Sequence, residues 1–122
     1  MANYKVIQGD SWQTTYTYQT SASNAINLAG GSFLLEVRDE PGGAILCATA
    51  SIGSIPSSGS AIGDGITVYS ASSGQIHVNL SPAKTRNFNL PRSAFQAQFT
   101  NASGDNTTFE NGWFVVDPGV IP

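Results

Sequence analysis

Two adjoining segments of the chain alternate strictly between apolar and polar residues. In residues 66–69 and again in residues 76–80, an aliphatic side chain occupies every second position. Successive side chains on a strand point to opposite faces, so a period of two buries one face and leaves the other in solvent. Residues 70–75, rich in Ser and Gly, separate the two segments. The pattern predicts two antiparallel strands with His77 and Asn79 on the solvent face.

Shorter segments with a similar character cover much of the remaining chain. They are residues 4–8, 12–19, 26–28, 33–38, 44–51, 95–100 and 107–116. Residues 44–51 are apolar on both faces, which predicts a central strand. The last segment is expected to break at Asn111-Gly112, because glycine interrupts strands. Ser81 followed by Pro82 predicts one short helical turn.

The spacing of these strands and their Gly, Asn and Ser turns predict an all-β fold. We expect an immunoglobulin-like antiparallel β-sandwich of about eight short strands, with a small β-barrel as the alternative. The 122 residues suffice for one core, so residues 1–122 are expected to form a single β-sandwich domain. The Cys…Trp…Cys pattern of antibody domains is absent. The predicted core consists of Phe33, Leu35, Val37, Ile76, Val78, Leu80, Phe95 and Phe99.

The composition narrows the class of protein. Only 11% of the residues are charged, against roughly 25% in an ordinary soluble domain. Ser, Thr, Asn, Gln and Gly take their place, which favours a protein that packs beside other chains. The net charge of −3 offers no electrostatic footprint for nucleic acid. The start of the chain has no apolar run typical of a signal peptide, and no apolar run is long enough to span a membrane.

The single cysteine excludes an internal disulfide framework. Cys47 lies in an apolar run and is expected to be a buried small hydrophobic residue rather than a nucleophile. His77 stands alone and is a poor metal ligand. The turn carboxylates Asp39-Glu40, Asp64 and Asp105 lack the spacing of a calcium site, so no metal is expected. No nucleophile motif is present either, and we therefore expect no cofactor and no enzymatic activity.

The aromatic residues allow two interpretations. Trp12, Tyr16 and Tyr18 share one face of a predicted strand and are spaced to form either a sugar-stacking platform or an inward sandwich face. The inward face is the favoured interpretation. Trp113 and Phe114 point to opposite faces of their strand, which leaves one of them exposed or at an interface.

A resemblance rests on the order of several short motifs. Residues 4–12, YKVIQGDSW, combine a short strand ending in Gly-Asp-Ser with the start of an aromatic-rich strand. The further matching pieces are residues 26–30 with 33–38, residues 64–68 with 73–78, residues 95–99 and the exit at residues 112–120. Together they span almost the whole chain. The chain resembles small phage and prophage virion proteins, similar to the N-terminal immunoglobulin-like domain of phage baseplate upper proteins.

That resemblance implies an attachment module, since in the family this domain joins receptor-binding parts to the tail. The larger proteins continue into a linker, coiled coil or binding domain, whereas this sequence stops at Ile121-Pro122. We therefore expect a non-enzymatic structural or adaptor protein of a tailed-phage virion, in the tail, neck or baseplate. The alternatives are a capsid decoration (cement) protein and a carbohydrate-binding module for host surface glycans.

The expected partners are other virion structural proteins and further copies of the chain, with no nucleic acid and no membrane. The expected location is the virion, after synthesis in the host bacterial cytoplasm. Residues 53–65 form a long loop with apolar residues among serines, which suggests either a contact with a partner or a mobile, solvated loop. The candidate interface residues in this loop and in the end strands are Ile55, Pro56, Ile62, Tyr4, Val6, Val120 and Ile121.

Overall fold

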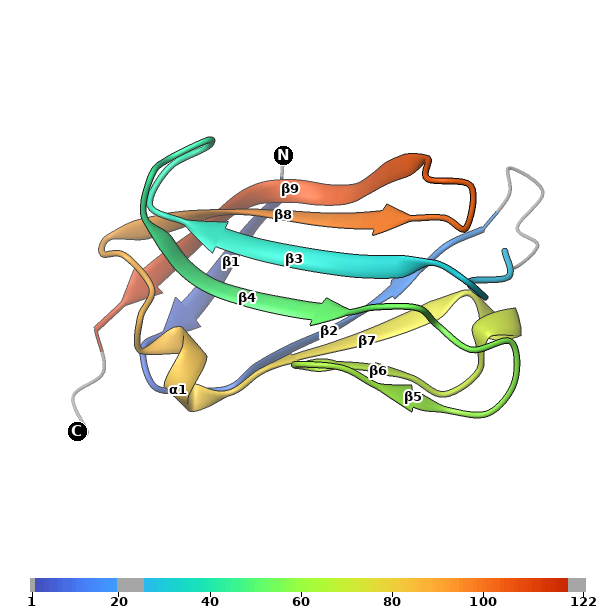
Figure 1. Cartoon of the computed structure of the whole chain (residues 1–122). Helices are drawn as coiled ribbons and strands as arrows, with labels where there is room; N and C mark the ends of the chain where they lie inside the picture. Colours follow the sequence, from blue (N-terminus) through green and yellow to red (C-terminus); the bar gives the residue numbers. More distant parts are fainter. Residues whose placement is uncertain (1, 20–25, 119–122) are drawn as a thin grey trace.

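The computed structural model describes residues 2–19 and 26–118, which form two β-sheets packed face to face (Figure 1). One sheet has the strand order β1 (Ala2–Ile7), β9 (Asn106–Asp117), β8 (Arg92–Thr100), β3 (Ser32–Arg38) and β4 (Leu46–Ile52). The other has the order β2 (Trp12–Thr17), β7 (Gln75–Leu80), β6 (Ile66–Val68) and β5 (Ala61–Ile62). A short 3-10 turn, η1 (Ala71–Ser73), precedes β7, and α1 (Pro82–Thr85) follows it.

The connectivity is that of an immunoglobulin-like sandwich. The order β9-β8-β3-β4 matches strands G, F, C and C′ of a variable-type domain, and β2-β7-β6 matches B, E and D. β1 pairs in parallel with the last strand, β9, whereas all the other described strand pairs are antiparallel. The predicted sandwich is therefore confirmed, and the barrel alternative is not what forms.

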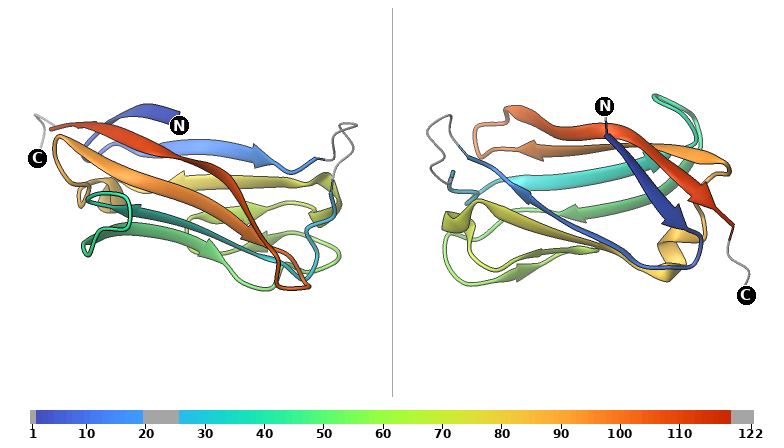
Figure 2. Two further views of the ribbon diagram at one scale, coloured as in Figure 1. Left: turned by 90° about the horizontal axis from the view of Figure 1, so that it is seen from above. Right: turned by 180° about the vertical axis from the view of Figure 1, so that it is seen from behind.

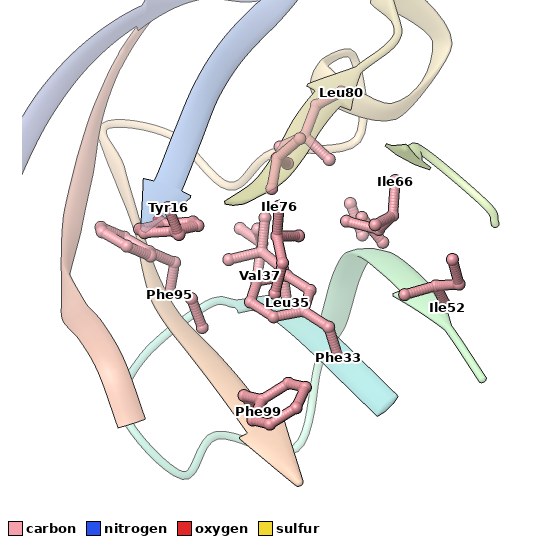
Figure 3. Packing of buried hydrophobic residues seen from close by; sticks show 14 of the residues in the cluster. Tyr16, Phe33, Leu35, Val37, Ile52, Ile66, Ile76, Leu80, Phe95 and Phe99 are labelled. Carbon is pink, nitrogen blue, oxygen red and sulfur yellow. The ribbon is translucent and has the colours of Figure 1, made fainter. Parts of the chain in front are cut away.

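The predicted core lies between the two sheets (Figure 3). All eight predicted core residues are buried, and none is more than 3% exposed. Trp12, Tyr16 and Tyr18 point into the same space and pack against this cluster, so the inward interpretation of these aromatics is correct. Phe114 joins them from β9 with an exposure of 0%.

The prediction of a central strand at residues 44–51 is wrong. β4 lies at the edge of the five-stranded sheet and pairs only with β3 among the described strands. Ala48, Ala50 and Ile52 face the core, while Ile45 and Leu46 are exposed and Cys47 is only half-buried. Hydrophobicity on both faces did not imply burial on both faces, because no further sheet among the described residues packs on the outer side of this strand. Residues 26–28 form no strand, although Leu28 is fully buried.

The predicted break at Asn111-Gly112 is also wrong. β9 runs without interruption to Asp117, and its irregularity lies earlier: Ala97 pairs with Glu110 but Gln98 pairs with Thr108. Phe109 is therefore an extra residue, a β-bulge, opposite β8. The bulge turns two consecutive side chains inward. Phe109 stacks on Phe33 and Phe99, and Glu110 reaches tyrosine hydroxyls between the sheets.

The long loop is partly built into the fold. The backbone of Ile55 exchanges hydrogen bonds with Gly30 and Gly31, and residues 61–62 form β5. Gly63 follows where the chain passes so close to β4 that a Cβ atom would lie 2.3 Å from the Ser51 carbonyl oxygen. The predicted helical turn after Ser81 is confirmed as α1, with Pro82 in its first turn.

Candidate interaction surfaces

Of the seven predicted interface residues, two are buried inside the domain. Val6 faces the core because the alternation of β1 turns it inward, and Ile55 packs into the core where the loop meets Gly30 and Gly31. Neither side chain is free to anchor a partner, so the prediction is wrong for both. Tyr4 also points inward and is half-buried.

Two other predicted residues are exposed. Pro56 is exposed, and Ile62 on β5 is 81% exposed, the largest exposure among the large hydrophobic side chains described. Val120 and Ile121 lie outside the described residues. The structure does not bring the five described residues together on one surface, since three of them point inward and only Pro56 and Ile62 are exposed.

An apolar strip whose members are not among the seven predicted interface residues lies on the outer face of β1 and β9. We define the β1/β9 strip as Ile7, Trp113 and Val115. Ile7 and Val115 are 44% and 46% exposed, and the Trp113 ring carries the Arg92 guanidinium 4.1 Å from its centre. Lys5 pairs with Asp117 at 3.2 Å beside the strip. Charged and apolar side chains therefore alternate on this face, since Lys5 is in register with Val115 and Ile7 with Asp117.

β1 also forms an edge of the five-stranded sheet (Figure 2). Gln8 donates its backbone N–H to Asp117, and backbone groups of successive residues point to opposite sides of a strand. The backbone N–H and C=O groups of Asn3, Lys5 and Ile7 consequently point away from β9, although the Ile7 carbonyl oxygen already accepts the Asp10 backbone N–H at 3.0 Å. Among the described strands none pairs with this side of β1, so it is an open edge on which a further strand fits.

The opposite edge of the same sheet, formed by β4, is protected against pairing with a further strand. The Lys84 ammonium donates to the Thr49 carbonyl oxygen on β4 and pairs with Asp64 at 2.9 Å. Ser51 and Asp64 exchange two backbone hydrogen bonds, of 2.9 and 2.8 Å. A lysine and a bridging loop are typical protections of an edge strand. The contrast with β1 identifies β1 as the more accessible of the two edges.

A shallow hollow of about 410 Å³ lies on the outer face of the four-stranded sheet. Its walls are Gln13, Thr14, Thr15, Thr67, Tyr69, His77, Val78 and Asn79. The predicted solvent-facing positions of His77 and Asn79 agree with their places in this wall. The Thr15 hydroxyl and His77 Nδ1 share a hydrogen bond of 2.9 Å.

A polar cluster between the sheets was not predicted. The Tyr4 hydroxyl lies 2.9 and 2.8 Å from the two oxygens of the Glu110 carboxylate, and the Tyr16 hydroxyl donates to Oε1 at 3.0 Å. Burial, followed by the charge and hydrogen bond of Glu110, raises the pKa of Tyr16 far above its usual value of 10.0. Burial and then Glu110 raise the pKa of Tyr4 in the same direction. Both phenols therefore stay protonated and donate.

The acidic turn residues do not converge. Asp64 is engaged by Lys84, and Asp105 lies in the exposed hairpin turn between β8 and β9. No group of three or more His, Cys, Asp or Glu residues that could hold a metal ion occurs in residues 2–19 and 26–118. In the same two ranges, neither helix has the length and apolar character needed to cross a membrane.

A scan of the chain against protein-family models gives no match, and a search of curated proteins gives none either.

Proposed function

We propose that this chain is a non-enzymatic structural or adaptor protein of a tailed-phage virion, in the tail, neck or baseplate. It acts by contacts with neighbouring subunits. The resemblance of its ordered motifs to phage baseplate upper proteins supports the virion, and the immunoglobulin-like sandwich agrees with the fold that this resemblance implies.

The observation that best supports a subunit contact is the open edge of β1 beside the β1/β9 strip. Edge-strand pairing supplies affinity through main-chain hydrogen bonds, and adjacent side chains supply specificity. Here the outward backbone groups of Asn3 and Lys5 offer the pairing, while Trp113 and Val115 offer an apolar surface next to it. Aromatic residues and arginine are common anchors of interfaces, and Trp113 with Arg92 stacked on it supplies both.

The test compares two substitutions of exposed apolar residues on the same sheet. Val115→Asp places a charge in the strip, and Leu34→Asp places one on β3, away from β1. The first is expected to abolish incorporation into particles made by the encoding phage or prophage, and the second to leave it unchanged. Circular dichroism establishes that both variants are folded.

The location of the labelled chain in purified particles completes the experiment. Recovery with the tail, neck or baseplate supports the adaptor role, whereas recovery on the capsid makes the chain a decoration protein instead. Absence from purified particles overturns the virion proposal. Normal incorporation of folded Val115→Asp overturns the assignment of the contact to the β1/β9 strip.

A further inference from the structure

The side chains that line the hollow on the outer face of the four-stranded sheet come from three neighbouring strands and form rows across the sheet. Thr15 on β2 and Thr67 on β6 are both in register with His77 on β7. Gln13 on β2 is in register with Asn79 on β7 and forms the next row. We propose that this hollow is a binding site for a neutral saccharide.

The chemistry of the walls matches sugar hydroxyls. Gln13 and Asn79 each carry an amide with two N–H donors and a carbonyl acceptor, and Thr15 and Thr67 carry hydroxyls that both donate and accept. A sugar ring presents alternating donors and acceptors of the same kind around its rim. Such a site fixes orientation through a few convergent polar groups.

Tyr69 supplies the apolar part of the site. Its side chain is 65% exposed, unlike Tyr16, which is 9% exposed in the core. The Tyr69 and His77 rings are 4.9 Å apart at an angle of 63°, so they form a corner rather than a flat stack. The exposed face of an aromatic ring packs against the C–H face of a pyranose. Tyr69 therefore serves as a wall against which one sugar ring rests.

The site is organised before a ligand arrives. The Thr15 hydroxyl fixes the His77 ring through Nδ1, and both residues stand on paired strands. The inward neighbours Ile66, Ile76 and Val78 are buried in the core and hold these strands in place. A rigid sheet loses little freedom on binding, which favours affinity for a small ligand.

Charge and size select the ligand class. None of the lining residues is a Lys, Arg, Asp or Glu, so the hollow has neither a cation for a phosphate or carboxylate nor an anion for a metal. Its volume of about 410 Å³ lies in the range of roughly 300–1,000 Å³ for small-ligand sites. A neutral mono- or oligosaccharide fits these limits better than a charged glycan.

The proposal goes beyond the adaptor role and is independent of it. The hollow lies on the four-stranded sheet, whereas the β1/β9 strip lies on the five-stranded sheet. Saccharide and subunit contacts can therefore be made at the same time, and loss of one site leaves the other intact.

The experiment is a titration of the ¹⁵N-labelled chain with lactose, maltotriose, chitobiose and rhamnose, followed by amide chemical shifts. At least one of these sugars is expected to give saturable shifts at residues 13, 67, 77 and 79. Tyr69→Ala is expected to weaken that binding by about tenfold or more, and Tyr69→Phe to preserve most of it. Leu34→Ala is the control, since it removes an exposed apolar side chain from the other sheet and leaves the affinity unchanged.

Sialyllactose provides the charged counterpart of lactose. It is expected to bind no better than the neutral sugar. Absence of saturable shifts with all four neutral sugars in the millimolar range overturns the proposal, as do shifts centred outside the hollow. Unchanged affinity in folded Tyr69→Ala, or clear preference for sialyllactose, overturns it as well.

Discussion

Replacing Glu110 with alanine removes the acceptor shared by two tyrosines between the sheets. Tyr16 is 9% exposed, so its hydroxyl, which donates at 3.0 Å, has little access to water as a substitute. A hydrogen bond to a charged group contributes about 1.5–3 kcal/mol, and Tyr4, which is half-buried, adds less because water replaces part of its bond. We expect Glu110→Ala to lower the free energy of unfolding by about 2–4 kcal/mol.

Glu110→Gln separates the contribution of the side chain's shape from the contribution of its negative charge. The amide keeps one carbonyl oxygen as an acceptor for the two hydroxyls but loses the negative charge, so the expected loss is about 1 kcal/mol. The combination of Tyr4→Phe and Tyr16→Phe with Glu110→Leu removes donors and acceptor together. It is expected to recover much of the loss, because no buried polar group is left without a partner.

The assay is chemical denaturation of the single and double variants in a double-mutant cycle. Tyr18→Phe is the matched control, because Tyr18 directly follows β2 and its hydroxyl lies 3.2 Å from the neutral Thr107 hydroxyl. Tyr16 and Glu110 are expected to couple, and Tyr18 and Glu110 are not. A loss below about 0.5 kcal/mol for Glu110→Ala, or additive effects of Tyr16→Phe and Glu110→Ala, would refute the reasoning.

Three further predictions concern the core, pH and metal. Phe95→Ala is expected to cost about 3–5 kcal/mol in chemical denaturation, since the ring is buried between the sheets, and a loss below about 1 kcal/mol would contradict this. The raised pKa of Tyr16 means that the folded state keeps a proton that the unfolded chain releases, so stability is full below pH 10.0 and falls as the pH rises above it. A pH series should show a flatter alkaline decline for Tyr16→Phe, and an identical decline would argue against burial of the phenol. A chelator should leave Tm unchanged, whereas a drop reversed by calcium would reveal a metal site.

Much of the fold follows from the sequence because one face of each long strand is buried. Phe33, Leu35 and Val37 on β3 and Phe95 and Phe99 on β8 keep a period of two, and every one of them faces the core. The order of the strands in the sheets, by contrast, does not follow from the sequence pattern. Cys47 and its apolar neighbours resemble a central strand, but whether another strand lies beyond β4 depends on tertiary pairing that local pattern does not contain.

The sequence of β9 contains a signal for the polar cluster, but the prediction assigned that signal to the wrong residues. On β9, Phe109 faces inward at an odd-numbered position, whereas Phe114 and Val116 face inward at even-numbered positions. The alternation of inward and outward side chains must therefore shift by one residue between Phe109 and Phe114. The prediction placed a break in the strand at Asn111-Gly112, whereas the strand is continuous there and the bulge at Phe109 produces the change. Correct placement makes Glu110 an inward residue and would have identified it. The hollow had no comparable signal, because it needs the register of β2, β7 and β6.

The bulge links the core to the proposed subunit contact. By turning Glu110 inward, it gives the Tyr4 hydroxyl an acceptor, and Tyr4 is one of two residues, with Val6, through which β1 reaches between the sheets. The rings of Trp12 and Phe95 lie against Tyr4, with centroids 5.3 and 5.8 Å away. β1 is therefore held from its inner face while its outer edge stays open. A strand fixed in this way offers a partner an edge that is already ordered, which lowers the entropic cost of pairing.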